Sequence, residues 1–277
     1  MSWYYVLWSL GCGLGAATSW LLFRARGGPA VRGAVVIATA VAGFVWGATL
    51  QFRLAFWHLG DAFLFSPTDV FVWGHMLPLG IVVGGAFAAA TALALRVPWL
   101  CMADALAIGA CVMMAAGRFG CVVAGCCTGS VCGRYLTPFC IRYGPGSEPY
   151  EWQQLAQIIP PSAELSLPVH PLPFYFIATS AMMAVVLFGI MRRSAKPGLA
   201  AAVFAVVYPA VTLLLEQVRG LRGGREVRLA VPAITLLASC VWLAVRYLIR
   251  WWGDPADRRR PGRVSDLSNS LRRAKQE

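Results

Sequence analysis

Residues 97–129 read V-P-W-L-C-M-A-D-A-L-A-I-G-A-C-V-M-M-A-A-G-R-F-G-C-V-V-A-G-C-C-T-G. The first part, 97–117, is an apolar run of about 20 residues, the length that a helix needs to cross the hydrocarbon core of a bilayer. The second part ends that run with Arg118 and three cysteines set among glycines. A charge at the rim of an apolar span is costly and is therefore a functional candidate. The stretch predicts a membrane-spanning helix that leads into a site.

The composition extends this interpretation to the whole chain. Of 277 residues, 58% are hydrophobic and 13% are charged, whereas a soluble domain carries about 25% charged residues. Six further apolar runs have the length of a membrane helix. The seven predicted spans are 2–23, 34–52, 70–95, 97–117, 171–191, 198–218 and 229–249. We therefore expect an all-α membrane protein with about seven transmembrane helices.

The net charge of +12 could suggest nucleic-acid binding. The basic residues, however, cluster between and after the apolar runs, which is typical of membrane orientation and of contact with anionic membrane lipids. We therefore expect no nucleic-acid partner. The basic loops are those that carry Arg24, Arg26, Arg32, Arg96, Arg192, Arg193 and Lys196, together with the tail.

The positive-inside rule places these basic loops in the cytoplasm. The N-terminus is then outside, the C-terminus is cytoplasmic, and the long 118–170 connection is an outer loop. Residues 1–250 are predicted to form one polytopic transmembrane domain. Residues 251–277 are predicted to be a basic, disordered cytoplasmic tail.

Five of the nine cysteines fall in the outer connection, where an oxidising exterior permits disulfides. They are Cys121, Cys126, Cys127, Cys132 and Cys140. Disulfides are favoured, with the connectivity left open. Zinc is a competing interpretation, weakened because no C-x-x-C pair occurs and His170 is distant in sequence. A nucleophilic cysteine beside Arg118 is the third alternative.

Arg219, Arg222, Arg225 and Arg228 lie together in an outer loop, against the positive-inside rule. They either extend toward lipid phosphates or form a headgroup site, since guanidinium groups bind phosphate oxygens in a bidentate manner. Glu216 precedes Arg219 by about one helical turn, so we expect the two to pair.

Other polar residues near the spans have more than one interpretation. His75 and His170 are each either interface residues or proton-transfer groups. Tyr175 suits an interface belt or the site, and Tyr208-Pro209 predicts a kink. Asp104 is expected to form hydrogen bonds inside its helix near the cytoplasmic end.

Four segments carry a resemblance to a known family. The segment 117–129 has the spacing of the signature G-R-[LI]-G-N-F-x-N-G-E-x-x-G, and 169–175 resembles R-H-P-S-Q-L-Y. Residues 208–219 resemble Y-G-x-x-R-x-x-x-E-x-x-R, and 71–85 is weakly similar to W-x-G-G-M-S-x-H-G-G. The chain thus resembles the prolipoprotein diacylglyceryl transferase family.

The resemblance implies transfer of diacylglycerol from phosphatidylglycerol to the lipobox cysteine of an exported preprolipoprotein, in the bacterial inner membrane, at a site that faces the outer leaflet. It implies no cofactor and no metal. The residues assigned to catalysis are Arg118, His170, Glu216 and His75. Those assigned to the phospholipid are Arg118, Arg219, Arg222, Tyr175, Tyr208, Gly120 and Gly125.

Several positions depart from the family pattern. Cys121 and Ala124 replace its two asparagines and Cys126 its glutamate. Thr212 stands at its functional arginine and Leu79 at its histidine, with His75 one turn away. A non-catalytic lipid-binding or assembly protein is therefore the alternative function. A transporter is disfavoured because the spans are almost purely apolar.

Overall fold

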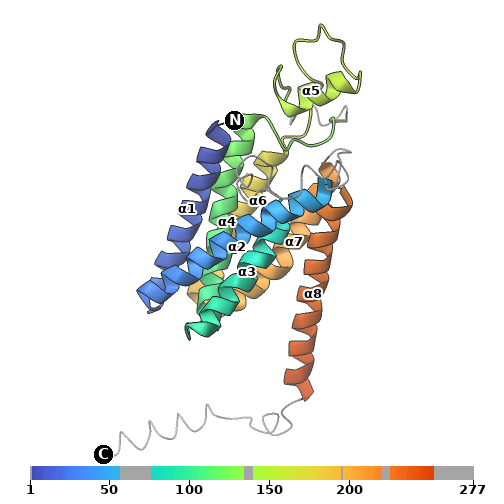
Figure 1. Ribbon diagram of the computed structural model, residues 1–277. Helices are drawn as coiled ribbons and strands as arrows, with labels where there is room; N and C mark the ends of the chain where they lie inside the picture. The colour runs from blue at the N-terminus through green and yellow to red at the C-terminus, as the bar shows by residue number, and fades with distance from the viewer. Residues whose placement is uncertain (1, 57–75, 134–139, 195, 220–224, 253–277) are drawn as a thin grey trace, which may run out of the picture. The chain divides into compact units, whose positions relative to one another are not determined.

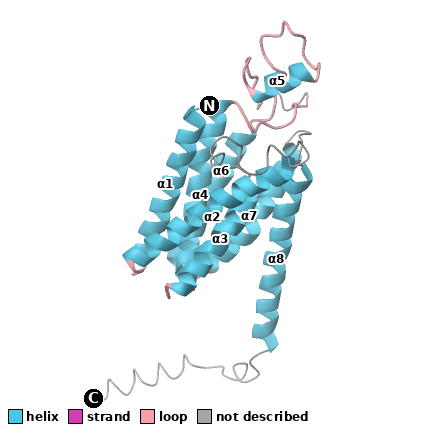
Figure 2. Cartoon of the chain, viewed as in Figure 1, coloured by secondary structure: helices cyan, strands magenta, loops and turns pink. Residues whose placement is uncertain are grey.

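The computed structural model describes residues 2–56, 76–133, 140–194, 196–219 and 225–252 (Figure 1). These residues form eight helices and no strand (Figure 2). All but α5 are long and apolar enough to cross a membrane, so the predicted all-α class with seven spans is confirmed. The helices are α1 Ser2–Ala25, α2 Ala30–Phe56, α3 Leu77–Ala94, α4 Trp99–Ala124, α5 Glu148–Leu155, α6 Leu172–Arg193, α7 Leu199–Val218 and α8 Arg225–Trp252.

Contacts divide the chain into two units, Met1–Leu236 and Leu237–Glu277. The first unit holds α1 to α7 and the start of α8. The described part of the second is the continuation of α8, which exposes Leu237, Val241 and Trp242. The predicted domain boundary at 250 and the tail 251–277 stay predictions, because residues 253–277 lie outside the described part of the chain.

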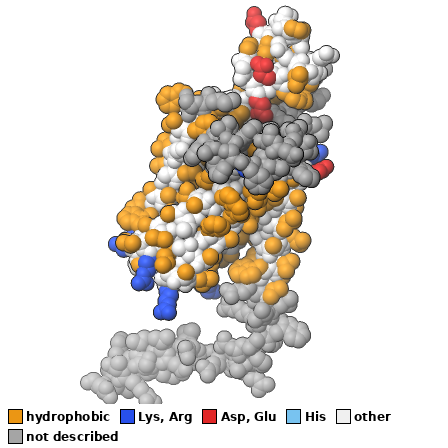
Figure 3. Space-filling view, in the orientation of Figure 1, with side chains coloured by type: hydrophobic (Ala, Val, Ile, Leu, Met, Phe, Trp, Pro, Cys, Tyr) orange, Lys and Arg blue, Asp and Glu red, His pale blue; other side chains and the backbone are white. Residues whose placement is uncertain are grey.

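Charge is distributed unevenly along the helices of the first unit. In Figure 3, basic side chains gather at the ends of α1, α2 and α3 that are remote from α5, while acidic side chains gather over α5. Apolar side chains cover the sides of the helices, as expected for surfaces that face lipid. This distribution agrees with the positive-inside argument, and the orientation itself stays a prediction.

Several helices begin or end differently from the sequence prediction, and two of these differences affect the site. α4 continues beyond the expected end at 117 as far as Ala124, so Arg118 and Cys121 are helical and not part of a loop. α8 begins at Arg225, which places Arg228 in its first turns. Glycines are frequent in membrane helices because small residues allow helix axes to approach closely, which is why Gly117 does not end α4.

The contact between α1 and α4 depends on such close approach. A Cβ atom added to Gly11 would lie 2.7 Å from the backbone nitrogen of Gly117. Next to the contact between α1 and α4 lies the buried core, which includes Leu187 of α6, Phe204 of α7 and Met114 of α4. α4 therefore contacts helices on more than one side and is the central element of the first unit.

A buried carboxylate fixes the other end of α4. Asp104 is 1% exposed, and its Oδ2 accepts hydrogen bonds from Arg26 Nη1 at 3.2 Å and from the Gly198 amide at 2.8 Å. Its Oδ1 accepts one from the Ala201 amide at 2.9 Å. Arg26 also donates to the carbonyl of Met191 at the end of α6. Asp104 thus forms hydrogen bonds as expected, but with other elements and not inside its own helix. It joins α4 to the start of α7 and to Arg26 of the α1–α2 connection, and Arg26 extends the contact to α6.

We predict that Asp104→Asn destabilises the protein by about 2–4 kcal/mol, because buried charged hydrogen bonds are lost and an amide donor faces amide donors. The midpoint of thermal unfolding in detergent should fall by several degrees. Glu226→Gln is the control, since Glu226 is exposed and its substitution should leave the midpoint unchanged. Equal midpoints for wild type and Asp104→Asn would contradict this role.

Candidate functional site

The end of α4 is a left-handed turn. Gly125 has φ +59° and caps the helix, and the Cys126 amide donates to the carbonyl of Cys121 at 3.1 Å. Glycine favours this backbone conformation because it has no Cβ atom. The turn returns the chain over the last turn of α4. As a result, the sulfur atoms of Cys121, Cys126 and Cys127 all lie within 4.8 Å of one another.

These three residues, the thiol cluster, are free cysteines. Cys127 has φ +59°, a left-handed conformation that is unfavourable for a residue with a side chain. Its amide donates to Glu148 Oε2 at 2.6 Å. Hydrogen bonds from the Cys121 and Cys126 thiols, with the charges of Arg219 and Arg118, hold the pKa of Cys127 well below its ordinary value. The site therefore favours a thiolate at Cys127.

Arg118 lies beside the thiol cluster. Its side chain is buried, at 8% exposure, and its Nη1 is 3.9 Å from Cys121 Sγ. The guanidinium carbon lies 4.4 Å from the ring centroid of Phe176, a cation–π geometry. Among the described residues, Arg118 Nε has no hydrogen-bond partner. A buried guanidinium with an unused donor is suited to bind an anion.

Glu216 is bound by two arginines. Its Oε1 is 3.1 Å from Arg219 Nε and its Oε2 is 3.3 Å from Arg228 Nε. The pairing of Glu216 with Arg219, expected from their spacing, is confirmed. All three side chains are mostly buried, so each ion pair is only weakly screened by solvent.

Electrostatic interactions join these groups into one site. Cys127 interacts with both Arg219 and Arg118. Tyr208 of α7 interacts with both Arg118 and Glu216. The ends of α4 and α7 thus bring together residues that are about a hundred positions apart in the sequence.

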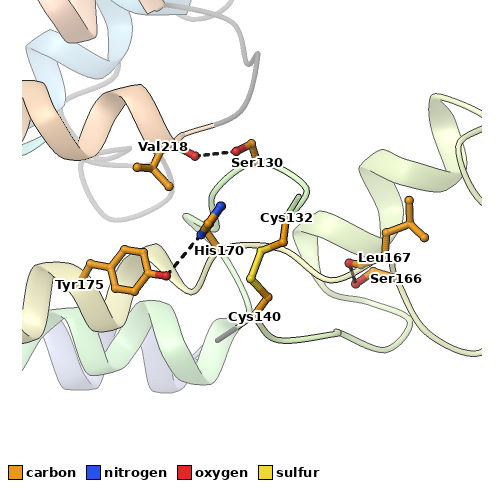
Figure 4. Close-up of a disulfide and its surroundings, with 8 residues drawn as sticks. All are labelled: Ser130, Cys132, Cys140, Ser166, Leu167, His170, Tyr175 and Val218. Carbon is orange, nitrogen blue, oxygen red and sulfur yellow. Dashed lines mark hydrogen bonds between the residues drawn. A yellow bond between two sulfur atoms is a disulfide. The ribbon is translucent and has the colours of Figure 1, made fainter. Parts of the chain in front are cut away.

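The segment that follows the thiol cluster is fixed against the end of α7. Ser130 donates through its amide and its hydroxyl to the carbonyl of Val218, at 2.9 and 3.0 Å. The Gly129 amide donates to the carbonyl of His170 at 2.8 Å, and the His170 amide donates to Ser130 at 3.1 Å. Figure 4 shows this arrangement, with Ser130 beside Val218 and His170 directed toward Tyr175. His170 Nδ1 is 3.3 Å from the Tyr175 hydroxyl oxygen.

One disulfide closes the same segment. Cys132 and Cys140 are bonded to each other next to His170 (Figure 4). The predicted disulfide is therefore present for this pair, whereas the other three outer cysteines form the thiol cluster instead.

Some predicted site residues have a different place. His75 and Arg222 lie outside the described residues. Gly120 packs against α1, since a Cβ atom there would lie 2.9 Å from the carbonyl oxygen of Tyr4, and Gly125 caps α4. Phe176 is absent from the predicted site. The sequence predicts Arg228 only as one of four arginines of a headgroup site, and it does not predict the pairing of Arg228 with Glu216. No spacing in the sequence indicates these two contacts, because they form only through tertiary packing.

An apolar pocket of about 330 Å³ lies among the membrane helices of the first unit. Phe44, Met113, Phe204 and Tyr208 line it, together with small residues of α1, α3 and α4. Tyr208 belongs both to this lining and to the surroundings of Arg118. Tyr208 therefore connects the apolar pocket to the charged site around Arg118.

A bundle of seven membrane-length helices, with buried arginines beside an apolar pocket, defines a multi-pass membrane protein. A sequence profile of the prolipoprotein diacylglyceryl transferase family matches residues 1–252. The chain belongs to this family, which implies a transferase of lipoprotein biosynthesis with a lipid donor and a lipoprotein substrate. No curated protein matches the chain.

We predict that Cys132→Ser with Cys140→Ser makes the outer segment more susceptible to protease. Closing a loop of this length stabilises it by about 2–3 kcal/mol in the chain-entropy description. Limited trypsin digestion should cut after Arg142 faster than in wild type. Cys240→Ser, at an exposed free cysteine, is the control. Unchanged cleavage would show that the disulfide does not restrain this segment.

Proposed function

We propose that this protein transfers the diacylglyceryl group of phosphatidylglycerol to the cysteine thiol of an exported preprolipoprotein and releases glycerol phosphate. One observation carries the proposal. The buried Arg118 has an unused Nε donor among the described residues and lies in one electrostatic site with Arg219 and Glu216. Membership of the family supports the reaction type.

The phosphate of the lipid binds Arg118 and Arg219, with Arg222 as a further candidate. When the bond between the glycerol carbon and the phosphate oxygen breaks, negative charge develops on the departing glycerol phosphate. Preorganised guanidinium donors stabilise such charge most strongly where water is excluded. Arginine suits this role because its planar donors match phosphate oxygens.

The acyl chains occupy the apolar pocket. Its lining of Phe44, Met113 and Phe204 offers the dispersion contacts that a hydrocarbon chain needs. Tyr208 lines the pocket and interacts with Arg118. The boundary between the acyl chains and the headgroup of the bound lipid therefore lies near Tyr208. Gly120 and Gly125 support the headgroup end of the site indirectly, through the backbone of α4 and its cap. Tyr175 supports it through its contact to His170.

Glu216 acts as a positioning residue. Both of its oxygens are bound by arginines, so it orients Arg219 and is poorly placed to accept a proton. His170 remains the candidate base, because its contact to Tyr175 uses Nδ1; in the tautomer in which Nδ1 donates to the Tyr175 hydroxyl oxygen, Nε2 can accept a proton. His75 is a second candidate.

The site faces the outer leaflet of a bacterial inner membrane in this proposal. The basic ends of α1 and α6, with Arg24, Arg192 and Arg193, are then cytoplasmic. The acidic α5 lies outside, where an exported acceptor peptide arrives. The disulfide between Cys132 and Cys140 agrees with an oxidising exterior.

We predict that Arg118→Ala lowers turnover by at least about 100-fold, the usual effect of removing one donor to a developing charge. The assay supplies purified protein in detergent with labelled phosphatidylglycerol and a lipobox peptide, and it measures release of glycerol phosphate. A peptide with serine in place of its cysteine should give no release.

Arg192→Ala is the matched control. Arg192 also lies over a phenylalanine of α6, Phe188, at 5.4 Å, but at the opposite end of that helix from Phe176. Its substitution should leave turnover near wild type. Normal turnover of Arg118→Ala would refute the site assignment. Lipid binding by wild type without release would favour the alternative, a lipid-binding protein that lacks transferase activity.

A further inference from the structure

We propose that Cys121, Cys126 and Cys127 bind one zinc ion through three thiolate sulfurs and leave a fourth coordination position open for the acceptor thiol. The role of the open position rests on the proposed transferase function. The metal site itself rests on the geometry of the thiol cluster.

The sulfur spacing fits a single ion. Zinc bonds to thiolate sulfur at about 2.3 Å, so three ligands of a tetrahedral ion lie about 3.8 Å apart. In the structure the three sulfurs are all within 4.8 Å of one another. Three protein ligands with one open position are typical of catalytic zinc, whereas structural zinc has four protein ligands.

The turn at Gly125 explains why the spacing in the sequence conceals this site. Cys121 and Cys126 are five positions apart, unlike the C-x-x-C pairs of common zinc sites. The amide of Cys126 bonds to the carbonyl of Cys121, which folds the chain back. Cys127 then has a left-handed backbone conformation, and its backbone N–H donates a hydrogen bond to the Glu148 carboxylate. Such strain in a non-glycine residue is typical of functional sites.

The charge balance favours a divalent ion. Three thiolates and one zinc ion carry a net charge of −1, and Arg118 Nη1 lies 3.9 Å from Cys121 Sγ. Before an acceptor thiol binds, Arg118 balances this charge, and the charge of Arg219 also acts on Cys127. A monovalent thiophilic ion would raise the negative charge of the buried cluster to −2, and burying a larger charge costs more. Hard cations such as Mg²⁺ prefer oxygen ligands.

Zinc would supply the thiolate that the reaction needs. A zinc ion held by Cys121, Cys126 and Cys127 would bind the acceptor sulfur as a thiolate, while the proton of the acceptor thiol would pass to the candidate base, His170 or His75. That sulfur then attacks the glycerol carbon that carries the phosphate. The C–S bond forms, the C–O bond breaks, and its electron pair leaves with glycerol phosphate. A thiol that coordinates a metal ion is deprotonated, so this route works near neutral pH.

The experiment measures metal binding by the full chain, purified in detergent with no lipid or peptide added. We expect about one zinc ion per chain by elemental analysis. Replacement of zinc by Co²⁺ should give an intense thiolate-to-cobalt charge-transfer absorption. This signal comes from the wild-type protein and does not depend on any variant folding.

Cys126→Ser should abolish the cobalt absorption and lower the zinc content by at least tenfold at equal protein. Cys101→Ser is the matched control, because Cys101 lies on the same helix as Cys121 but outside the thiol cluster. It should bind zinc and cobalt like wild type. Thermal midpoints of both variants establish that they are folded.

Two results would overturn the proposal. One is absence of zinc and of the cobalt absorption from folded wild type. The other is a titration of denatured, metal-free protein that finds five thiols and not the seven free thiols of the structure, because a second disulfide would then occupy the cluster. Zinc binding without turnover would leave the site intact and count against the transferase function alone.

Discussion

The carboxylate of Asp104 is the interaction on which the arrangement of the helices depends. It is buried among apolar side chains, yet each of its oxygens accepts from a positive or amide donor. A carboxylate in this setting is favourable only when all of these donors are in place. Asp104 therefore fixes the start of α7 relative to α4. Since α7 ends at Glu216 and α4 ends at the thiol cluster, this contact determines how the site residues meet.

The two ends of the α4–α7 pair differ in charge. At the Asp104 end one carboxylate has one arginine and two amides as donors. At the other end, Glu216 is shared by Arg219 and Arg228, and the buried Arg118 lies in the same electrostatic site. The first set of charges is balanced and holds the helices together. The second is rich in positive charge, which is the condition for binding anions.

The membrane helices could be predicted from the sequence because apolar runs of sufficient length have one stable outcome in a bilayer. Their ends could not, since Gly117 packs against α1 and lets α4 continue through Arg118 to Ala124. Among site residues, Glu216 and Arg219 could be paired because they are one turn apart. The thiol cluster, Phe176 beneath Arg118 and the reach of Arg228 to Glu216 depend on tertiary packing, which spacing does not encode.

The thiol cluster and the phosphate site draw on the same positive charge. Three thiolates would carry −3, more than Arg118 and Arg219 together can balance, so without an ion Cys121 and Cys126 stay thiols that hydrogen-bond to Cys127. With zinc bound, the cluster carries −1 and needs only Arg118, which lies beside Cys121. Arg219, held by Glu216, then stays available for the single negative charge of a phosphodiester. A divalent ion thus lowers the charge of three thiolates from −3 to −1 and leaves the positive charge of Arg219 for an anionic lipid in the same buried site.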